Sequence, residues 1–393
     1  MQAIVLSAGK GTRMRPLSNE VPKPMLPVAG QPITAHTAEA AVEAGADELV
    51  FVVGYGEEIV RDYFGSSYRG VPVSYVVQDE QQGTADAVHA TKEHIDGPFS
   101  VLYGDNLYDP EGIDRLFDAA PSIASIRVSN PSNYGVLNVS DGAVTEISEK
   151  PDVPQNDLVN AGAYVFPEEA RDMLDVSPSE RGERELTDVL DRVISEFTVS
   201  PVTLDRWMDV GRPWELLEAN EWKLGTLDRR VDGEVSDDAT IQGSVVIEDG
   251  ATVRGGSVVE GPAYVSEGAS VGPNAYVRGN TYLAPDVHIG HAVEIKNSVI
   301  LENTNVGHLS YVGDSVVGRN ANFGAGTNVA NLRHDGEDVE LTVKGERVST
   351  GRKKFGVVVG DGVKTGINTG LHPGVTLSED ARTDPGEIVA HDK

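Results

Sequence analysis

The hydrophobic positions follow different patterns in the two halves of the chain. Up to about Asp228, short apolar runs alternate with segments whose apolar residues have helical spacing. Strand-like runs lie at Ala3–Leu6, Leu49–Val53, Val73–Val77 and Phe99–Leu102, and helical patterns lie at Ile33–Ala44, Glu57–Phe64 and Thr84–His94. This alternation predicts a mixed, mainly parallel sheet covered by helices. The segment Tyr134–Ile147, with its Ser-Asp-Gly turn, predicts a hairpin added to that sheet, and Trp214–Leu224 predicts a last helix.

From Val235 onward, an apolar residue falls at every sixth position. These residues are Val235, Ile241, Ile247, Val253, Val259, Val265, Val271, Val277, Leu283, Ile289, Ile295 and Leu301, then, after one-residue slips, Val306, Val312, Val317, Phe323 and Val329. A last run with the same period consists of Val359, Thr365, Leu371 and Leu377, in which Thr365 is the one polar residue. Neither helices nor alternating strands have this period, whereas a hexapeptide-repeat parallel β-helix does. The polar stretch Asn331–Arg352 interrupts the pattern and is expected to be a projecting loop. We therefore expect two domains, residues 1–228 and 229–393.

Composition narrows the possible functions. The chain carries 62 acidic and 32 basic side chains, a formal net charge of −30. A field of that sign repels phosphate backbones and anionic membranes, so neither nucleic acid nor a membrane is an expected partner. The even spread of acidic residues, with Lys scarcer than Arg, predicts a protein adapted to a salty cytoplasm.

The absence of cysteine and of long apolar runs predicts where the protein works. With no Cys, disulfides, thiolate zinc sites and a Cys nucleophile are excluded, which fits a reducing cytosol. No run of eighteen apolar residues and no signal-peptide pattern is present, so we expect a soluble, cytoplasmic protein.

A glycine-rich loop follows the first predicted strand. It reads Leu6-Ser-Ala-Gly-Lys-Gly-Thr-Arg-Met-Arg-Pro-Leu, and Val21-Pro-Lys-Pro-Met-Leu comes shortly after it. Glycines after a strand allow backbone amides to approach a phosphate, and Lys10, Arg13 and Lys23 supply positive charge. A glycine-rich loop alone is weak evidence, and this one is neither a Walker A nor a dinucleotide-binding sequence. The whole string, however, resembles the signature of sugar-1-phosphate nucleotidylyltransferases.

Further segments resemble the same family in the expected order, and the resemblance implies a Rossmann-like nucleotidyltransferase domain. It implies nucleotide binding by Leu6, Ala8, Gly9, Gly11, Thr12, Gln78, Gly83 and Thr84, with the Gln78 amide pairing with a pyrimidine base. It implies sugar-phosphate binding by Gly135, Glu149, Lys150 and Asn160, and catalytic roles for Arg13 and Lys23. Tyr103-Gly104-Asp105 and Trp207-Met208-Asp209 resemble the segments that supply metal-binding carboxylates.

Physical chemistry supports the metal assignment independently. Asp105 follows a predicted strand of an open α/β sheet, and ligands of such sheets bind beyond the carboxyl ends of the strands. Two carboxylates hold Mg²⁺, which prefers oxygen ligands and keeps waters and substrate phosphates. The sugar-phosphate oxygen then attacks the α-phosphorus in line and pyrophosphate leaves. Positioning and charge neutralisation are sufficient for this chemistry.

A second candidate site lies in the repeat region. Two strings mark this site: Ala292-Val-Glu294-Ile-Lys296 and Val306-Gly-His308-Leu-Ser-Tyr311-Val-Gly-Asp. They resemble the acetyltransferase half of the bacterial N-acetylglucosamine-1-phosphate uridyltransferase/glucosamine-1-phosphate acetyltransferases. The resemblance implies a left-handed β-helix, with His308 as base and Arg278 and Lys296 binding the sugar phosphate. It also implies that Tyr311, Asn322 and Asn331 surround the amine and acetyl groups. A histidine with a pKa near 6.5 can relay the amine's proton.

The full layout resembles the archaeal bifunctional sugar-1-phosphate nucleotidylyltransferase/acetyltransferases. This resemblance implies acetyl transfer from acetyl-CoA to glucosamine-1-phosphate, Mg²⁺-dependent nucleotidyl transfer from UTP or dTTP, and a homotrimer. One alternative is a single-activity glucose-1-phosphate uridylyl- or thymidylyltransferase with a structural β-helix. Another is a non-catalytic subunit that binds sugar nucleotides. Pyrophosphate release separates the non-catalytic alternative from the two enzymes, and thiol release from acetyl-CoA separates the two enzymes.

Overall fold

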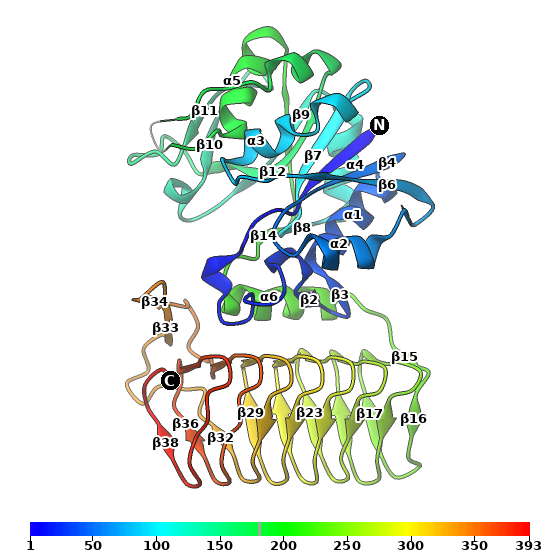
Figure 1. Cartoon of the computed structure of the whole chain (residues 1–393), viewed down its shortest axis with the longest axis vertical. Helices are drawn as coiled ribbons and strands as arrows, with labels where there is room; N and C mark the ends of the chain where they lie inside the picture. Colours follow the sequence, from blue (N-terminus) through cyan, green and yellow to red (C-terminus); the bar gives the residue numbers. More distant parts are fainter. Residues whose placement is uncertain (180–181) are drawn as a thin grey trace. The chain divides into compact units, whose positions relative to one another are not determined.

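The computed structural model describes residues 1–179 and 182–393, and its contacts divide the chain into two compact units (Figure 1). The first unit comprises Met1–Lys10, Val21–Leu26 and Pro32–Val210. The second comprises Gly11–Glu20, Pro27–Gln31 and Gly211–Lys393. Helix α6 (Pro213–Leu224) forms at the expected place and packs against strand β24 (Thr281–Leu283) of the second unit. A domain boundary at residue 228 stays a prediction.

The first unit is built on a mixed sheet whose central strands run parallel. Its strand order is β11-β10-β12-β7-β1-β4-β6-β5, with β9 and β13 attached beside β12. The strands are β1 (Gln2–Leu6), β4 (Glu48–Val53), β5 (Ser67–Tyr68), β6 (Val71–Val77), β7 (Phe99–Tyr103), β9 (Ser122–Arg127), β10 (Gly135–Ser140), β11 (Ala143–Glu149), β12 (Leu158–Phe166) and β13 (Ser200–Thr203). Strand β1 pairs in parallel with both β4 and β7, and β10 pairs with β11 as the predicted hairpin. The expected α/β architecture is confirmed.

Helices cover both faces of this sheet because the buried strands carry apolar residues on both sides. Helices α1 (Ile33–Glu43), α2 (Glu57–Phe64) and α4 (Pro110–Asp118) pack in one apolar cluster, and α3 (Thr84–His89) and α5 (Leu186–Glu196) pack in the other. The predicted helix at Thr84–His94 is too long. It ends at His89, and only a 3-10 turn follows at Lys92–His94, because the Thr91 hydroxyl donates to the Val88 carbonyl and replaces a helical bond.

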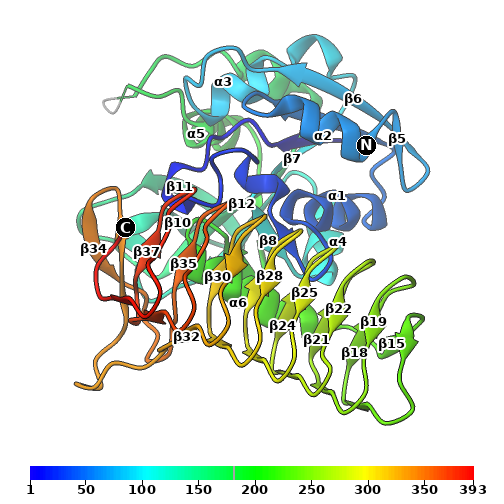
Figure 2. The ribbon, with the colours of Figure 1, turned by 60° about the horizontal axis from the view of Figure 1, so that its bottom comes forward.

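The repeat region of the second unit is a β-helix of three parallel sheets (Figures 1 and 2). The first sheet contains β15 (Arg230–Val231), β18 (Val245–Ile247), β21 (Ala263–Val265), β24, β27 (Val299–Ile300), β30 (Val316–Val317), β35 (Val358–Val359) and β37 (Thr376–Leu377). The second contains β16 (Glu234–Val235), β19 (Thr252–Val253), β22 (Ser270–Val271), β25 (His288–Ile289), β28 (Asn305–Val306) and β31 (Asn322–Phe323). The third contains β17 (Thr240–Gln242), β20 (Val258–Glu260), β23 (Tyr276–Arg278), β26 (Glu294–Lys296), β29 (Tyr311–Gly313), β32 (Asn328–Val329), β36 (Gly370–Leu371) and β38 (Ile388–Val389). This fold confirms the β-helix prediction.

The register of one coil differs from the predicted one. Ile300, not Leu301, pairs with Leu283 in the coil before it and with Val317 in the coil after it. The one-residue slip therefore comes before Ile300 rather than after Leu301. Val299, Ile300 and Leu301 are all buried, so hydrophobicity alone could not locate the slip.

The segment that interrupts the repeats forms a β-hairpin between β32 and β35. Strands β33 (Glu340–Val343) and β34 (Glu346–Ser349) pair antiparallel around the turn residues Lys344 and Gly345, which have φ values of 51° and 87°. Such positive φ values at both positions suit a tight hairpin turn. Among the described residues, no helix has the length and apolar character needed to cross a membrane.

Candidate active sites

Lys23 lies between two carboxylates in the first unit. It begins a 3-10 turn, while Asp105 follows β7 and Asp209 ends β14 (Trp207–Asp209). The Lys23 Nζ is 2.5 Å from Asp105 Oδ2 and 3.7 Å from Asp209 Oδ1. Strand β14 pairs antiparallel with β8 (Asn106–Tyr108), so Asp209 lies opposite Asn106, next to Asp105. The structure thus brings together three of the predicted site residues from distant parts of the chain.

The donor set at this position fits Mg²⁺. Two carboxylates face one buried ammonium, and in the described part of the chain no group of three His, Cys, Asp or Glu side chains could hold a metal. Magnesium needs only one or two carboxylates when waters and substrate phosphates complete its shell.

The loops after β1 and β7 are held together at the carboxyl ends of the strands. The Gly104 amide donates to the Leu6 carbonyl at 2.9 Å. A Cβ atom at Gly104 would lie 2.5 Å from Ser7 Oγ, so a side chain would separate the two loops. Ala8 follows in the same loop, and its carbonyl accepts from Gln81 Nε2. A Cβ at Gly9 would meet no atom within 4 Å, which leaves the backbone there accessible to a ligand.

The predicted base-binding segment is tied to the start of α3, which in turn contacts the start of α5. Gln78 Nε2 donates to Asp86 Oδ2 at 2.8 Å and to the Gly83 carbonyl at 3.2 Å. With both amide hydrogens engaged, Gln78 can offer a base its carbonyl oxygen, which suits the N3–H donor of uracil or thymine. Gly83 has a φ of 126°, and its Cβ would lie 2.2 Å from the Arg184 carbonyl, so only glycine fits. Thr84 Oγ1 accepts from the Leu186 amide at 3.0 Å.

The predicted sugar-binding residues come from the β10–β11 hairpin and from β12. Gly135 pairs with Glu149, and the Lys150 ammonium lies 3.4 Å from Glu149 Oε1. Lys150 has a φ of 46°, and its amide donates to the Tyr134 carbonyl. The Asn160 side chain is engaged internally, because Oδ1 accepts from the Gly162 amide at 2.8 Å and Nδ2 donates to the Tyr164 hydroxyl.

The partly buried Tyr103 and the buried Tyr164 join the base-binding and sugar-binding segments. Tyr103 hydrogen-bonds to Thr84 and to Tyr164, which in turn contacts Asn160. Burial raises the pKa of Tyr103 to about 12 and that of Tyr164 well above its ordinary value, so both hydroxyls stay protonated. The linking role of Tyr164 was not predicted. An aromatic residue in a buried strand reads as core, and no sequence signal distinguishes it.

The remaining residues of the glycine-rich loop fall in the second unit. Gly11 adopts a left-handed conformation, with a φ of 61°, and precedes a 3-10 turn at Thr12–Met14. Ser18 Oγ donates to the Gly11 carbonyl at 2.8 Å. Thr12 and Arg13 line a cavity of about 560 Å³ together with Arg15 and Lys344. Positive charge is thus gathered around Arg13.

Most of the predicted acetyltransferase residues share the outer face of the third sheet of the β-helix. Arg278, Lys296 and Gly313 are register neighbours on successive coils, as are Glu294 and Tyr311. Arg278 Nε donates to Glu294 Oε1 at 2.8 Å, and the Lys296 Nζ lies 2.7 Å from Asp314 Oδ2. Asn331 Nδ2 donates to the Tyr311 hydroxyl at 3.1 Å.

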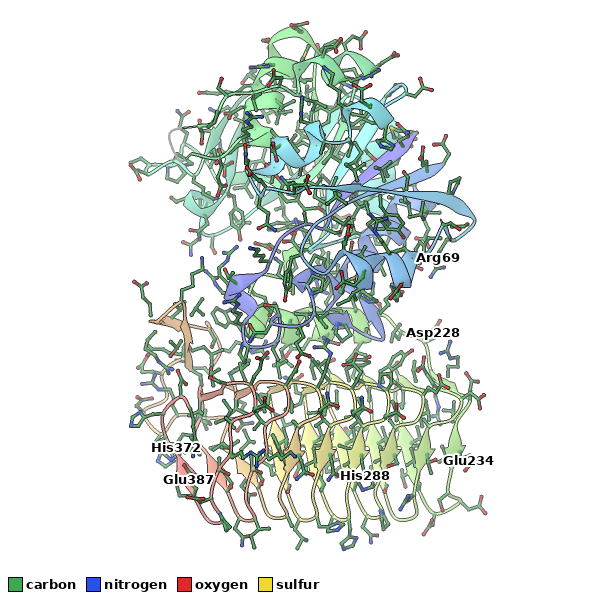
Figure 3. The ribbon with its side chains drawn as sticks, in the orientation of Figure 1. Arg69, Asp228, Glu234, His288, His372 and Glu387 are labelled. Atoms are coloured by element: carbon green, nitrogen blue, oxygen red, sulfur yellow. The ribbon has the colours of Figure 1, made fainter. Side chains whose placement is uncertain are left out.

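Gly313 and His372 lie beside predicted residues of this face but were not themselves predicted as functional. A Cβ at Gly313 would lie 2.3 Å from the Tyr311 hydroxyl, so glycine is needed for Tyr311 to fold toward Asn331. Burial, followed by the negative charge of Asp314, raises the pKa of Tyr311. Tyr311 and Asn331 also line a cavity of about 490 Å³ with His372, which Figure 3 labels.

His308 lies at the corner between β28 and β29. Its Nδ1 accepts a hydrogen bond from the His291 amide at 3.1 Å. The neutral imidazole therefore carries its hydrogen on Nε2, which acts as a donor. Asn322 is not brought to the face that carries Arg278, Lys296 and Tyr311. It belongs to the second sheet, where its Oδ1 accepts from Asn305.

Comparison with known proteins covers the whole chain. The "Nucleotidyl transferase" family model matches residues 2–224, and the "GMPPB C-terminal domain" model matches residues 259–365. The chain is 41% identical over 380 residues to the "Bifunctional protein GlmU" of Methanocaldococcus jannaschii, covering 96% of this chain and 92% of that protein. It is 37% identical over 401 residues to the "Bifunctional sugar-1-phosphate nucleotidylyltransferase/acetyltransferase" of Sulfurisphaera tokodaii, covering 100% of this chain and 98% of that one.

A solved structure supports the fold of the N-terminal part. The crystal structure of a UDP-glucose pyrophosphorylase complexed with UDP-glucose superposes with a TM-score of 0.52 at 24% sequence identity. It covers 56% of this chain and 96% of the pyrophosphorylase chain.

Proposed function

This chain belongs to the family of bifunctional sugar-1-phosphate nucleotidylyltransferase/acetyltransferases, and we propose that it converts glucosamine-1-phosphate into a nucleotide-linked N-acetyl amino sugar. Acetyl-CoA supplies the acetyl group, and UTP or dTTP supplies the nucleotidyl group. The observation that carries the proposal is the position of Lys23 between Asp105 and Asp209 at the carboxyl end of β7. That arrangement provides both signs of charge needed to hold a metal and a triphosphate.

Nucleotidyl transfer is proposed to take place at this group of residues. Asp105 and Asp209 would hold Mg²⁺, which when bound neutralises phosphate charge. Lys23 and Arg13 add positive charge to the triphosphate, and the backbone of Leu6, Ala8, Gly9, Gly11 and Thr12 binds it. Gln78, Gly83 and Thr84 orient the base, while Gly135, Glu149, Lys150 and Asn160 orient the sugar phosphate. A phosphate oxygen of the sugar forms a bond to the α-phosphorus, and the bond to pyrophosphate breaks.

Acetyl transfer is proposed to take place on the outer face of the β-helix. The sugar's amine nitrogen bonds to the thioester carbonyl carbon, the carbon–sulfur bond breaks, and coenzyme A leaves as its thiol. Arg278 and Lys296 bind the sugar phosphate, while Tyr311, Asn322 and Asn331 surround the reacting groups. His308 accepts the amine's proton. The lone pair of Nδ1 is engaged by the His291 amide and Nε2 carries the hydrogen. The imidazole must therefore leave that contact before it can accept a proton.

A homotrimer is proposed as the working form. Within one chain Asn322 lies on a different sheet from Tyr311, and a site shared between neighbouring β-helices would allow both to take part. The flat faces of a hexapeptide β-helix suit packing around a threefold axis. A cytoplasmic location stays a prediction.

One coupled assay tests the proposal. Purified protein in high KCl with Mg²⁺ is offered acetyl-CoA, a panel of sugar phosphates, and UTP or dTTP. Pyrophosphate and thiol are measured on the same preparation, and we expect both to be released. Pyrophosphate without thiol would support the single-activity uridylyl- or thymidylyltransferase, and neither product would support a non-catalytic subunit.

A further inference from the structure

A buried carboxylate that has no role in the proposed mechanism lies beneath the acetyl-transfer face. Asp314 directly follows β29, and only 3% of its surface is exposed. Its φ of 51° lies in the left-handed region, which Asp and Asn tolerate better than most residues. Its amide donates to the Lys296 carbonyl at 2.8 Å, so the backbone is fixed next to the neighbouring coil. A buried carboxylate is costly unless it is fully paired.

Three side chains satisfy this carboxylate, and two of them belong to the proposed substrate site. Asp314 Oδ2 accepts from the Lys296 ammonium at 2.7 Å and from Asn331 Nδ2. Asp314 Oδ1 accepts from Asn297 Nδ2 at 2.9 Å. The same Asn331 amide group also reaches the Tyr311 hydroxyl. One carboxylate therefore sets the positions of Lys296 and Asn331 directly, and that of Tyr311 through Asn331.

The other oxygen of Asp314 is linked through Asn297 to helix α6 and Arg352 of the same unit. Asn297 Nδ2 also donates to Glu221 Oε1 of α6 at 2.8 Å. Glu221 and Glu218 in turn bind the Arg352 guanidinium, which is mostly buried. This network leaves the carboxylate little freedom to move, which a group that positions others requires.

We propose that Asp314 is a positioning residue for acetyl transfer. This inference rests on the proposed function. Asp314 aims the Lys296 ammonium at the sugar phosphate and holds Asn331 and Tyr311 beside the acetyl acceptor. With its side chain 4% exposed, it does not touch substrate itself. It acts as an outer-shell group does around a metal ligand, where its loss commonly lowers function about 10- to 100-fold.

The test is a double-mutant cycle between Asp314→Asn and Lys296→Gln, followed by thiol release from acetyl-CoA. Asn keeps the size of the side chain and tolerates the left-handed backbone. We expect Asp314→Asn alone to lower kcat/KM for glucosamine-1-phosphate about 10- to 100-fold, mainly through KM for the sugar phosphate. In the Lys296→Gln background its effect should be several-fold smaller, because the main group that it positions is gone. KM for acetyl-CoA should change little.

Asp361→Asn is the matched control. Asp361 is another buried carboxylate of the β-helix, but it pairs with Arg319 and has no contact with the proposed site. We expect this variant to keep its kcat/KM for acetyl transfer. Equal losses in the Asp314 and Asp361 variants, or an equal Asp314 effect with and without Lys296, would overturn the inference.

Two further measurements separate a folding failure of the variant from a failure of the proposed acetyl transfer. If Asp314→Asn does not fold, the cycle is run between Lys296→Gln and Asn331→Ala, which share Asp314 Oδ2. Coupling between them supports the inference, and strictly additive losses contradict it. If the wild-type protein releases pyrophosphate but no thiol, the proposed acetyl transfer itself fails, and the inference fails with it.

Discussion

Asp105→Asn is the sharpest test of the first site, because this substitution removes one charge and almost no volume. The variant loses the 2.5 Å ion pair with Lys23, whose side chain is only 7% exposed. Asp209 Oδ1 lies farther from the Lys23 Nζ, at 3.7 Å, beyond hydrogen-bonding distance. The buried ammonium therefore loses a short, charge-assisted hydrogen bond.

The expected stability change follows from this geometry. A hydrogen bond to a charged group contributes about 1.5–3 kcal/mol when it is buried. Asp105 is 32% exposed, so solvent screening reduces the loss to about 1–2 kcal/mol. For a unit of this size that corresponds to a fall in melting temperature of about 2–8 °C. Asp209→Asn weakens a longer ion pair with Lys23, at 3.7 Å, and should cost less than about 1 kcal/mol.

The activity change should be larger and confined to one reaction. Losing a metal-binding carboxylate removes several kcal/mol of charge stabilisation, so nucleotidyl transfer should fall about a thousandfold or more. Acetyl transfer should be nearly unchanged. Pyrophosphate and thiol release, measured on the same preparation with a melting curve, provide the assay. Undiminished pyrophosphate release at ordinary Mg²⁺ would refute the metal assignment.

Three other predictions concern the base, the charge and the oligomer. His308→Ala should lower thiol release about 100- to 10,000-fold while pyrophosphate release from a pre-acetylated sugar phosphate persists; full acetyl transfer would place the base elsewhere. With a net charge of −30, the melting temperature should rise from dilute buffer to molar KCl because salt screens self-repulsion; an unchanged value would contradict salt adaptation. A fragment starting near Asp232 should trimerise in high salt, and light scattering showing monomers alone would exclude this.

Much of the fold could be predicted from the sequence because burial follows local spacing. The six-residue period identified the β-helix, since each coil buries one residue per side on the coil before it. The alternation of apolar runs located β1, β4, β6 and β7 for the same reason. The pattern did not define the register where three buried apolar residues follow one another, at Val299, Ile300 and Leu301. Any of the three could have been the inward residue of that coil.

The identities of many candidate site residues could also be predicted, but not their contacts. The glycine-rich string and the Asp105 and Asp209 segments are local motifs, and a motif is visible wherever it lies in the chain. That Lys23 sits between those two carboxylates depends on how β8 pairs with β14, which no local pattern contains. Likewise, the family resemblance grouped Asn322 with Tyr311, whereas the chain between them passes through the first sheet and places the two residues on different sheets.

Asp314 shows most clearly what only the tertiary structure decided. In the sequence it is one of 62 acidic residues, and it follows a Tyr-Val-Gly string as an ordinary turn residue would. Only the stacking of successive coils brings Lys296, Asn297 and Asn331 around its carboxylate. The sequence by itself determined which residues are apolar, which are charged and how they repeat. The partners of a buried charge were decided by the fold, because they come from separate coils and meet only when the chain is wound.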